Sequence, residues 1–167
     1  MLLCTLHVVF LILNQECSVQ TAARLYFLKQ VKHAKVNPKD MLLFYTTCIR
    51  PVLEYACSVL HHALPQYLSN NIERLQKRVL RIIYPDLSHA VALVAAGISS
   101  LYERRQALSE TLFDQIMRDP CHKLHDLLPS RNKSTYCIQT RGYFELPICK
   151  TLRFRNTFIM SRIFNYK

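Results

Sequence analysis

This sequence has very little glycine and no tryptophan, with only two glycines among its 167 residues. A turn-rich β-fold draws on glycine at many turns, and Gly97 and Gly142 alone cannot build a glycine-rich phosphate-binding loop. Half of the residues are apolar, and Leu, Arg, Lys and Gln, which are good helix formers, are frequent. The composition therefore predicts an all-α fold.

The motifs of metal and polymerase chemistry are also missing. No Asp-Asp pair, C-x2-C pair or H-x3-H pair occurs, although structural zinc generally needs two closely spaced ligand pairs. Glu110 and Asp114 share a helix face, but no further acid is recruited to them. We expect no enzyme activity, no metal and no cofactor. Two short clusters nevertheless combine cysteine with histidine: Cys57, His61 and His62, and Cys121, His122 and His125.

A long apolar run is lacking as well. Met1 to Leu13 is almost wholly apolar, but it is shorter than the roughly 20 residues that span a bilayer, and no Lys or Arg precedes it. A signal peptide, a membrane anchor, an apolar helix packed on the fold and an unstructured leader all remain open for it. Seven scattered cysteines, an odd number, indicate a reducing compartment. We expect a cytoplasmic or nuclear protein, with membrane attachment or secretion as the alternatives.

Acidic residues are scarce relative to basic ones. There are 22 Lys and Arg against 11 Asp and Glu, a formal charge of +11. Residues 127–167 hold eight basic residues and one acid, Glu145. Such an excess favours a polyanionic partner, either nucleic acid or an anionic membrane.

Apolar periodicity and cap signals divide the chain into helices. We expect helices over 18–33, 38–63, from Pro65 to Tyr84, over 88–96 and over 100–119, with a kink near 47–50 because Pro51 lacks an N–H. The fold should be a small bundle of about five helices with an irregular basic tail. The expected organisation is an apolar leader at 1–17, a helical domain at 18–129 and the tail at 130–167.

The segment after Pro65 has the clearest amphipathic pattern. Its apolar line should pack on the preceding helix through Leu43, Leu53, Leu75, Val79 and Ile82. Opposite that line lies a basic stripe, which could neutralise phosphates or could be an ordinary solvated helix face. The stripe consists of Arg74, Lys77, Arg78 and Arg81.

The tail offers a second basic set. Its basic residues could follow a nucleic-acid backbone while the aromatic residues stack on bases, or the aromatics could cover the bundle while the arginines face water. Arg153 and Arg155 are its leading candidates. The interleaved residues are Arg141, Lys150, Arg153, Arg155 and Arg162 with Tyr143, Phe144, Phe154 and Phe158.

Between Ala22 and Tyr166, a series of short sequence motifs in a fixed order resembles that of a known family. They are Arg24 to Gln30, Leu43 to Tyr45, Ile49 to Cys57, Ile72 to Arg78, Arg81 to Pro85, Leu101 to Arg105, His122 to Leu124, Leu128-Pro129, Glu145 to Thr151 and Arg153 to Ile159. Together they resemble the region after the palm in jockey-like non-LTR retrotransposon reverse transcriptases. Ser58-Val59-Leu60 departs from that family's Pro-Val-Trp, and Val91 replaces a common acid.

The resemblance implies a thumb, a helical bundle that grips the primer-template duplex, without the catalytic turn Tyr/Phe-Ala-Asp-Asp. It therefore implies a non-catalytic remnant that binds duplex or structured nucleic acid without sequence preference. Two other hypotheses stand beside it. One is a small membrane-associated or protein-interaction module anchored by Met1 to Leu13, and the other is a genomic relic with no selected role.

Overall fold

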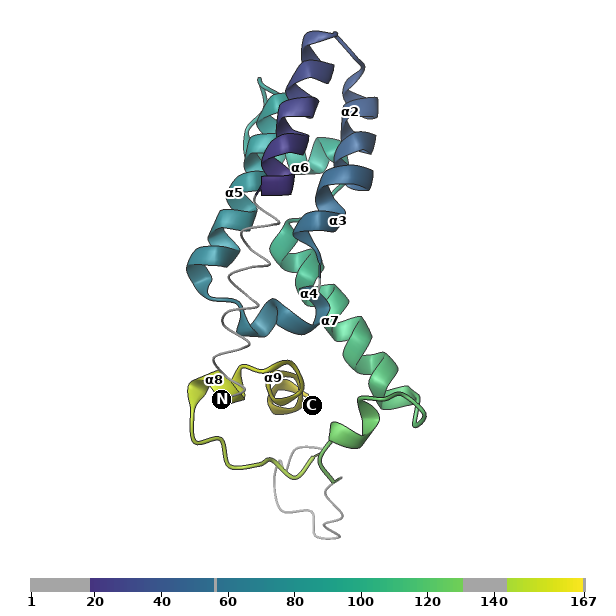
Figure 1. Cartoon of the computed structure of the whole chain (residues 1–167), viewed down its shortest axis with the longest axis vertical. Helices are drawn as coiled ribbons and strands as arrows, with labels where there is room; N and C mark the ends of the chain where they lie inside the picture. The colour runs from purple at the N-terminus through teal and green to yellow at the C-terminus, as the bar shows by residue number, and fades with distance from the viewer. Residues whose placement is uncertain (1–18, 56, 131–143, 167) are drawn as a thin grey trace. The chain divides into compact units, whose positions relative to one another are not determined.

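The computed structural model describes residues 19–55, 57–130 and 144–166 (Figure 1). These residues form helices and contain no β-strand, so the predicted all-α fold is confirmed. The chain divides into two compact units. Of the described residues, the first unit comprises 19–55 and 67–101, and the second comprises 57–66, 102–130 and 144–166. The apolar leader expected over 1–17 lies outside the described residues.

The first unit begins with two neighbouring helices joined by a tight turn. A helix over 19–33 is followed by a turn at Lys35, whose φ of 56° is left-handed. The Val36 N–H donates to the Val31 carbonyl and the Lys35 N–H to the Lys32 carbonyl, as in a Schellman cap. Helix α2 (Pro38–Phe44; Figure 1) follows Asn37. The Asn37 side chain accepts from the Lys39 N–H at 3.0 Å. The Asn37-Pro38 pair of the sequence, which predicts an N-cap followed by a proline at the first helical position, has both roles in the structure.

The expected kink before Pro51 takes the form of a π-helical turn. Tyr45–Ile49 forms η1, in which the Arg50 N–H reaches back five residues to the Tyr45 carbonyl. Pro51 has no N–H and its ring crowds the carbonyl four residues earlier, so the regular α-helical ladder cannot run through this point. Helix α3 (Arg50–Leu53) follows and ends at Glu54. The chain turns at Glu54 and Tyr55 before α4 (Cys57–Leu60) and η2 (His61–Ala63). The expectation of a single helix over 38–63 is therefore wrong.

Helix α5 (Gln66–Ile83) and helix α6 (His89–Ala96) complete the first unit. Ser88 caps the start of α6 and Gly97, with φ 63°, ends it, as the sequence predicts. Leu53 and Val79 are buried, with Leu75 and Ile82 packed against them, but Leu43 is 60% exposed. The expectation that Leu43 packs in the core is wrong. The core of this unit is Leu25, Leu28, Met41, Tyr45, Ile49, Leu53, Val79, Ile83 and Leu101.

The second unit is built around helix α7 (Leu101–Arg118), whose first residue is counted with the first unit. Its buried line runs through Arg105, Ser109, Phe113 and Ile116, while Leu108 and Leu112 are only half-buried. The apolar spacing of the sequence predicts a core line through Leu101, Leu108, Leu112 and Ile116, and the structure fully buries only the first and last of these residues. A short 3-10 turn, η3 (His125–Leu127), follows.

The tail is more regular than expected. Thr151 caps α8 (Leu152–Arg155) by accepting from the Phe154 N–H at 3.2 Å, and α9 (Phe158–Asn165) follows Thr157. Phe158 and Ile163 of α9 are buried with Phe113 and Ile116 of α7, and Phe113 meets Phe158 edge-on at 6.3 Å. This apolar contact gives the tail a helix that its local sequence pattern did not reveal. The described residues consequently contain more helical segments than the five expected.

Candidate nucleic-acid interface

Helix α5 presents its basic stripe to solvent. Arg74, Lys77, Arg78 and Arg81 are all exposed, and the helix buries Gln76, Val79, Leu80 and Ile83 on the other side. Arg74 donates to the Asn71 side chain at 3.4 Å, a long contact that leaves most of the guanidinium to water. The sequence pattern therefore predicted the exposure of these four side chains correctly. Whether they bind phosphate remains a prediction.

Lys77 differs from the three arginines in its surroundings. The pKa of His89, near the start of α6, is lowered by burial first and by the positive charge of Lys77 second, with Glu73 opposing. Lys77 therefore lies close enough to α6 for its charge to act there. We accordingly expect Lys77 to contribute less to phosphate binding than Arg74, Arg78 and Arg81.

Some basic side chains of the first unit donate hydrogen bonds to backbone carbonyls of the same unit. Arg24 donates to the Cys48 carbonyl in the π-helical turn, and Lys32 donates to the Ile82 carbonyl in the last turn of α5. Cations at these carbonyls satisfy acceptors left over by irregular or terminal helix geometry. Arg24 and Lys32 thus stabilise the fold, whereas the side chains of the stripe are exposed to solvent.

A feature that the sequence pattern missed lies beside the stripe. A hollow of about 240 Å3 opens between the helix over 19–33 and α5. Tyr26 and Lys29 come from the first helix and Arg78 from the second. No periodicity argument could find this hollow, because the sequence does not say which helix lies next to α5. Its lining residues are Ala22, Leu25, Tyr26, Lys29, Leu75 and Arg78.

The tail arginines occupy a short, exposed helix of the second unit. Arg153 and Arg155 are exposed in α8, and the Arg155 guanidinium lies 4.9 Å from the centre of the Phe164 ring. A cation held over an aromatic face is partly committed to its own chain. Phe144 and Phe158 are buried in the core, so these two aromatics cannot stack on bases as one hypothesis required. Arg141 and Tyr143 lie outside the described residues.

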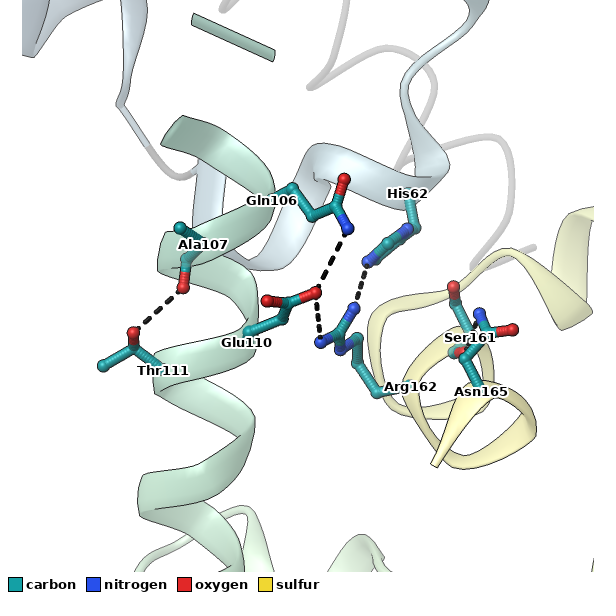
Figure 2. Close-up of polar contacts among 8 residues, drawn as sticks. All are labelled: His62, Gln106, Ala107, Glu110, Thr111, Ser161, Arg162 and Asn165. Carbon is teal, nitrogen blue, oxygen red and sulfur yellow. Dashed lines mark hydrogen bonds and ion pairs between the residues drawn. The ribbon is translucent and has the colours of Figure 1, made fainter. Parts of the chain in front are cut away.

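Arg162 takes part in a polar cluster between α7, η2 and α9 (Figure 2). Its guanidinium lies 3.0 Å from a Glu110 carboxylate oxygen and 3.5 Å from the His62 ring, and Gln106 donates to the same carboxylate at 3.2 Å. The Gln106 and Arg162 hydrogen bonds lower the pKa of Glu110, against a small opposing effect of burial. The cluster fixes α9 to α7, and Arg162 is therefore a structural cation.

Burial lowers the pKa of both histidines in η2. His61 is 8% exposed, and its ring lies 5.0 Å from that of Tyr102 and 4.8 Å from that of His62. Burial lowers the pKa of His61 to about 4, with the charges of His62, Arg105 and Arg162 acting in the same direction. Within the described ranges, no three His, Cys, Asp or Glu side chains are grouped as metal ligands. Cys57, although near in sequence, does not complete such a group.

Comparisons with known proteins give no relative for this chain: no family model, no curated protein and no solved structure matches it. Among the residues that the structure describes, no helix is both long enough and apolar enough to cross a bilayer.

Proposed function

We propose that this chain binds the backbone of duplex or structured nucleic acid, without sequence preference, through the basic stripe of α5. The supporting observation is the segregation of α5 into a buried apolar side and an exposed side bearing Arg74, Lys77, Arg78 and Arg81. Exposed cations on a rigid helix can neutralise successive phosphates and release their counterions. Arg153 and Arg155 would extend such binding to the tail. The resemblance to the thumb of a non-LTR reverse transcriptase supports the same function, and we propose that the chain is a non-catalytic remnant of one.

The stripe is tested by a salt titration of duplex binding. Replacing Arg74, Arg78 and Arg81 together by Ala should weaken binding to unrelated duplex sequences alike and flatten the dependence of log K on log salt by about three units, about one per lost phosphate contact. The fold should persist because all three side chains are exposed. Circular dichroism checks that the helix content is retained.

A matched control removes the same net charge elsewhere. Lys39, Arg118 and Lys123 are also exposed, and their replacement by Ala lowers the net charge by three without touching α5. If general attraction to the protein is the cause of binding, both triple variants will lose affinity equally. Equal losses would refute the proposal that the stripe binds nucleic acid. A folded stripe variant that binds with unchanged affinity and salt dependence would refute it as well.

We also expect the chain to incorporate no nucleotide on a primed template in Mg²⁺ or Mn²⁺. Two-metal polymerase chemistry needs carboxylates gathered around both ions, and the sequence contains no Asp-Asp pair. The measurement is primer extension with the purified chain beside a polymerase as positive control. Template-dependent extension that copurifies with the chain through successive columns would contradict this expectation.

A further inference from the structure

The hollow between the helix over 19–33 and α5 combines an aromatic ring with cations. Tyr26 is 64% exposed, so its ring is open to a ligand that enters the hollow. Its apolar lining residues are Ala22, Leu25 and Leu75, and its other lining residues, Tyr26, Lys29 and Arg78, carry polar groups. No acidic residue lines it. This lining suits a ligand with a flat apolar body and an anionic attachment.

The size of the hollow further limits which ligands can bind there. Its volume of about 240 Å3 lies below the roughly 300–1,000 Å3 typical of sites for drug-sized ligands. A small flat group fits such a space, whereas the stacked base pairs of a duplex do not enter it. Arg78 belongs both to the hollow and to the basic stripe, so a strand bound along the stripe passes the hollow's edge.

We propose that this hollow takes one unpaired nucleotide, with its base stacked on Tyr26 and its flanking phosphates at Lys29 and Arg78. The inference rests on the proposed function, because the stripe brings the strand to the hollow. It adds a ligand preference to that function: nucleic acid with an unpaired nucleotide binds more tightly than a fully paired duplex. Stacking on an aromatic ring is available to every base, so the preference carries no sequence specificity.

The test compares one duplex in two forms, fully paired and with a single-nucleotide bulge, by fluorescence anisotropy at several salt concentrations. The wild type should bind the bulged form more tightly. Tyr26→Ala should reduce that preference roughly 5- to 150-fold, the range for one base stacked on an aromatic residue, and should leave paired-duplex affinity nearly unchanged. Tyr26→Trp should retain the preference, since the larger ring still stacks.

The neighbouring residue supplies the control. Phe27 is 61% exposed, almost the same as Tyr26, but it lines a different hollow and its ring lies 6.2 Å from that of Phe44. Phe27→Ala should therefore keep the preference for the bulge. An equal loss in Phe27→Ala and Tyr26→Ala would overturn the assignment, because it would indicate a general effect on the first helix.

A change in the ligand checks the same contact from the other side. When the unpaired nucleotide is abasic, the wild type should lose the preference, and Tyr26→Ala should lose nothing further. 2-Aminopurine at the unpaired position should lose fluorescence on binding to the wild type, as a stacked base does, and not on binding to Tyr26→Ala. Additive losses from the two changes would mean that Tyr26 does not stack on this base.

Lys29 separates this inference from the proposed function. Lys29→Ala should flatten the salt dependence by about one unit for the bulged ligand and leave it unchanged for the paired duplex. If the wild type binds both forms equally while the stripe variant loses both, the proposed function stands and the hollow's role fails. If the wild type binds neither form at low salt, both fail. Loss of binding to phosphatidylserine vesicles in Tyr26→Ala, without any change for nucleic acid, would assign the hollow to a lipid surface and refute the proposal.

Discussion

Replacing Gln76 by alanine is expected to lower the free energy of unfolding by about 3 kcal/mol. Gln76 is 1% exposed although it lies in α5, which carries the basic stripe on its other side. Its side-chain amide accepts from the Leu101 N–H and donates to the Ser99 carbonyl, both at 3.1 Å. The variant deprives a buried N–H of this acceptor and leaves a cavity beside it, and both changes destabilise the fold.

Two further variants separate the two contributions. Gln76→Met fills nearly the same volume without either hydrogen bond, so it should lose about 1–2 kcal/mol. Gln106→Ala makes the same chemical change in α7, where the side chain is half-buried and donates to the exposed end of Glu110, and it should lose less than about 1 kcal/mol. Urea denaturation followed by circular dichroism gives all three values. Equal losses for Gln76→Ala and Gln106→Ala would show that the Gln76 bonds do not hold α5 to the Ser99–Leu101 segment.

The same residue illustrates what the sequence could and could not predict. In the pattern after Pro65, the basic stripe is exposed as expected, but of the expected apolar line only Val79 is fully buried. Leu75 and Ile82 pack at the edge of the core, and the most buried side of α5 runs through Gln76, Leu80 and Ile83. Gln76 lies next to that apolar line but has a polar side chain, so hydrophobic periodicity leaves it to solvent. Only the position of the Leu101 N–H makes its burial favourable, and that contact joins residues 25 positions apart.

Errors in the predicted core have a related cause. The segment after Pro38 is apolar around most of its circumference, so periodicity cannot choose the buried face. The π-helical turn at Tyr45–Ile49 then changes the phase, and Met41 and Tyr45 are buried instead of Leu43. Burial raises the pKa of Tyr45 to about 12, with the Gln76 side chain partly opposing that rise. A polar-tipped ring at the centre of the core was not foreseeable from local pattern.

The candidate interface shows the same limit. Exposure of the stripe follows from the phase of one helix, which the sequence provides. The hollow depends on the helix over 19–33 lying beside α5, and the tail helix α9 depends on the apolar side chains that α7 offers to it. Such pairings between elements are tertiary information. The sequence therefore predicted α5, α6 and α7 well, but not which elements pack on one another.

Lowering the pH from 7 to 4 is expected to destabilise the second unit by about 2–3 kcal/mol through His61 alone. In the folded chain the pKa of His61 is lowered from 6.5 to about 4, first by burial and then by the charges of His62, Arg105 and Arg162, with Glu110 opposing. The unfolded chain therefore binds a proton near pH 6.5 that the folded chain refuses until about pH 4. The contribution of neutral His61 to the free energy of unfolding is present above pH 6.5 and is lost as the pH falls from 6.5 to about 4.

The structural reason is that a charged His61 has no suitable surroundings. Its Nδ1 is buried and meets no hydrogen-bond partner among the described residues, while its ring packs against Tyr102. His62, whose pKa is also lowered by burial first and by Arg162 second, acts in the same direction. The pKa of Glu110 is lowered too, so its contribution is lost only at still lower pH.

Urea denaturation at pH 7.5, 6.5, 5.5 and 4.5 measures this dependence. His61→Gln cannot take up a proton, so its stability should fall less steeply across the window than that of the wild type, even if it starts lower at pH 7.5. His33→Gln is the matched control, because His33 is exposed, and it should follow the wild-type curve. If His61→Gln loses as much stability as the wild type between pH 6.5 and 4.5, the acid sensitivity does not arise at His61. Measuring His62→Gln next would then show whether it arises at the ring that contacts Arg162, since that ring titrates beside the cation that holds α9 to Glu110.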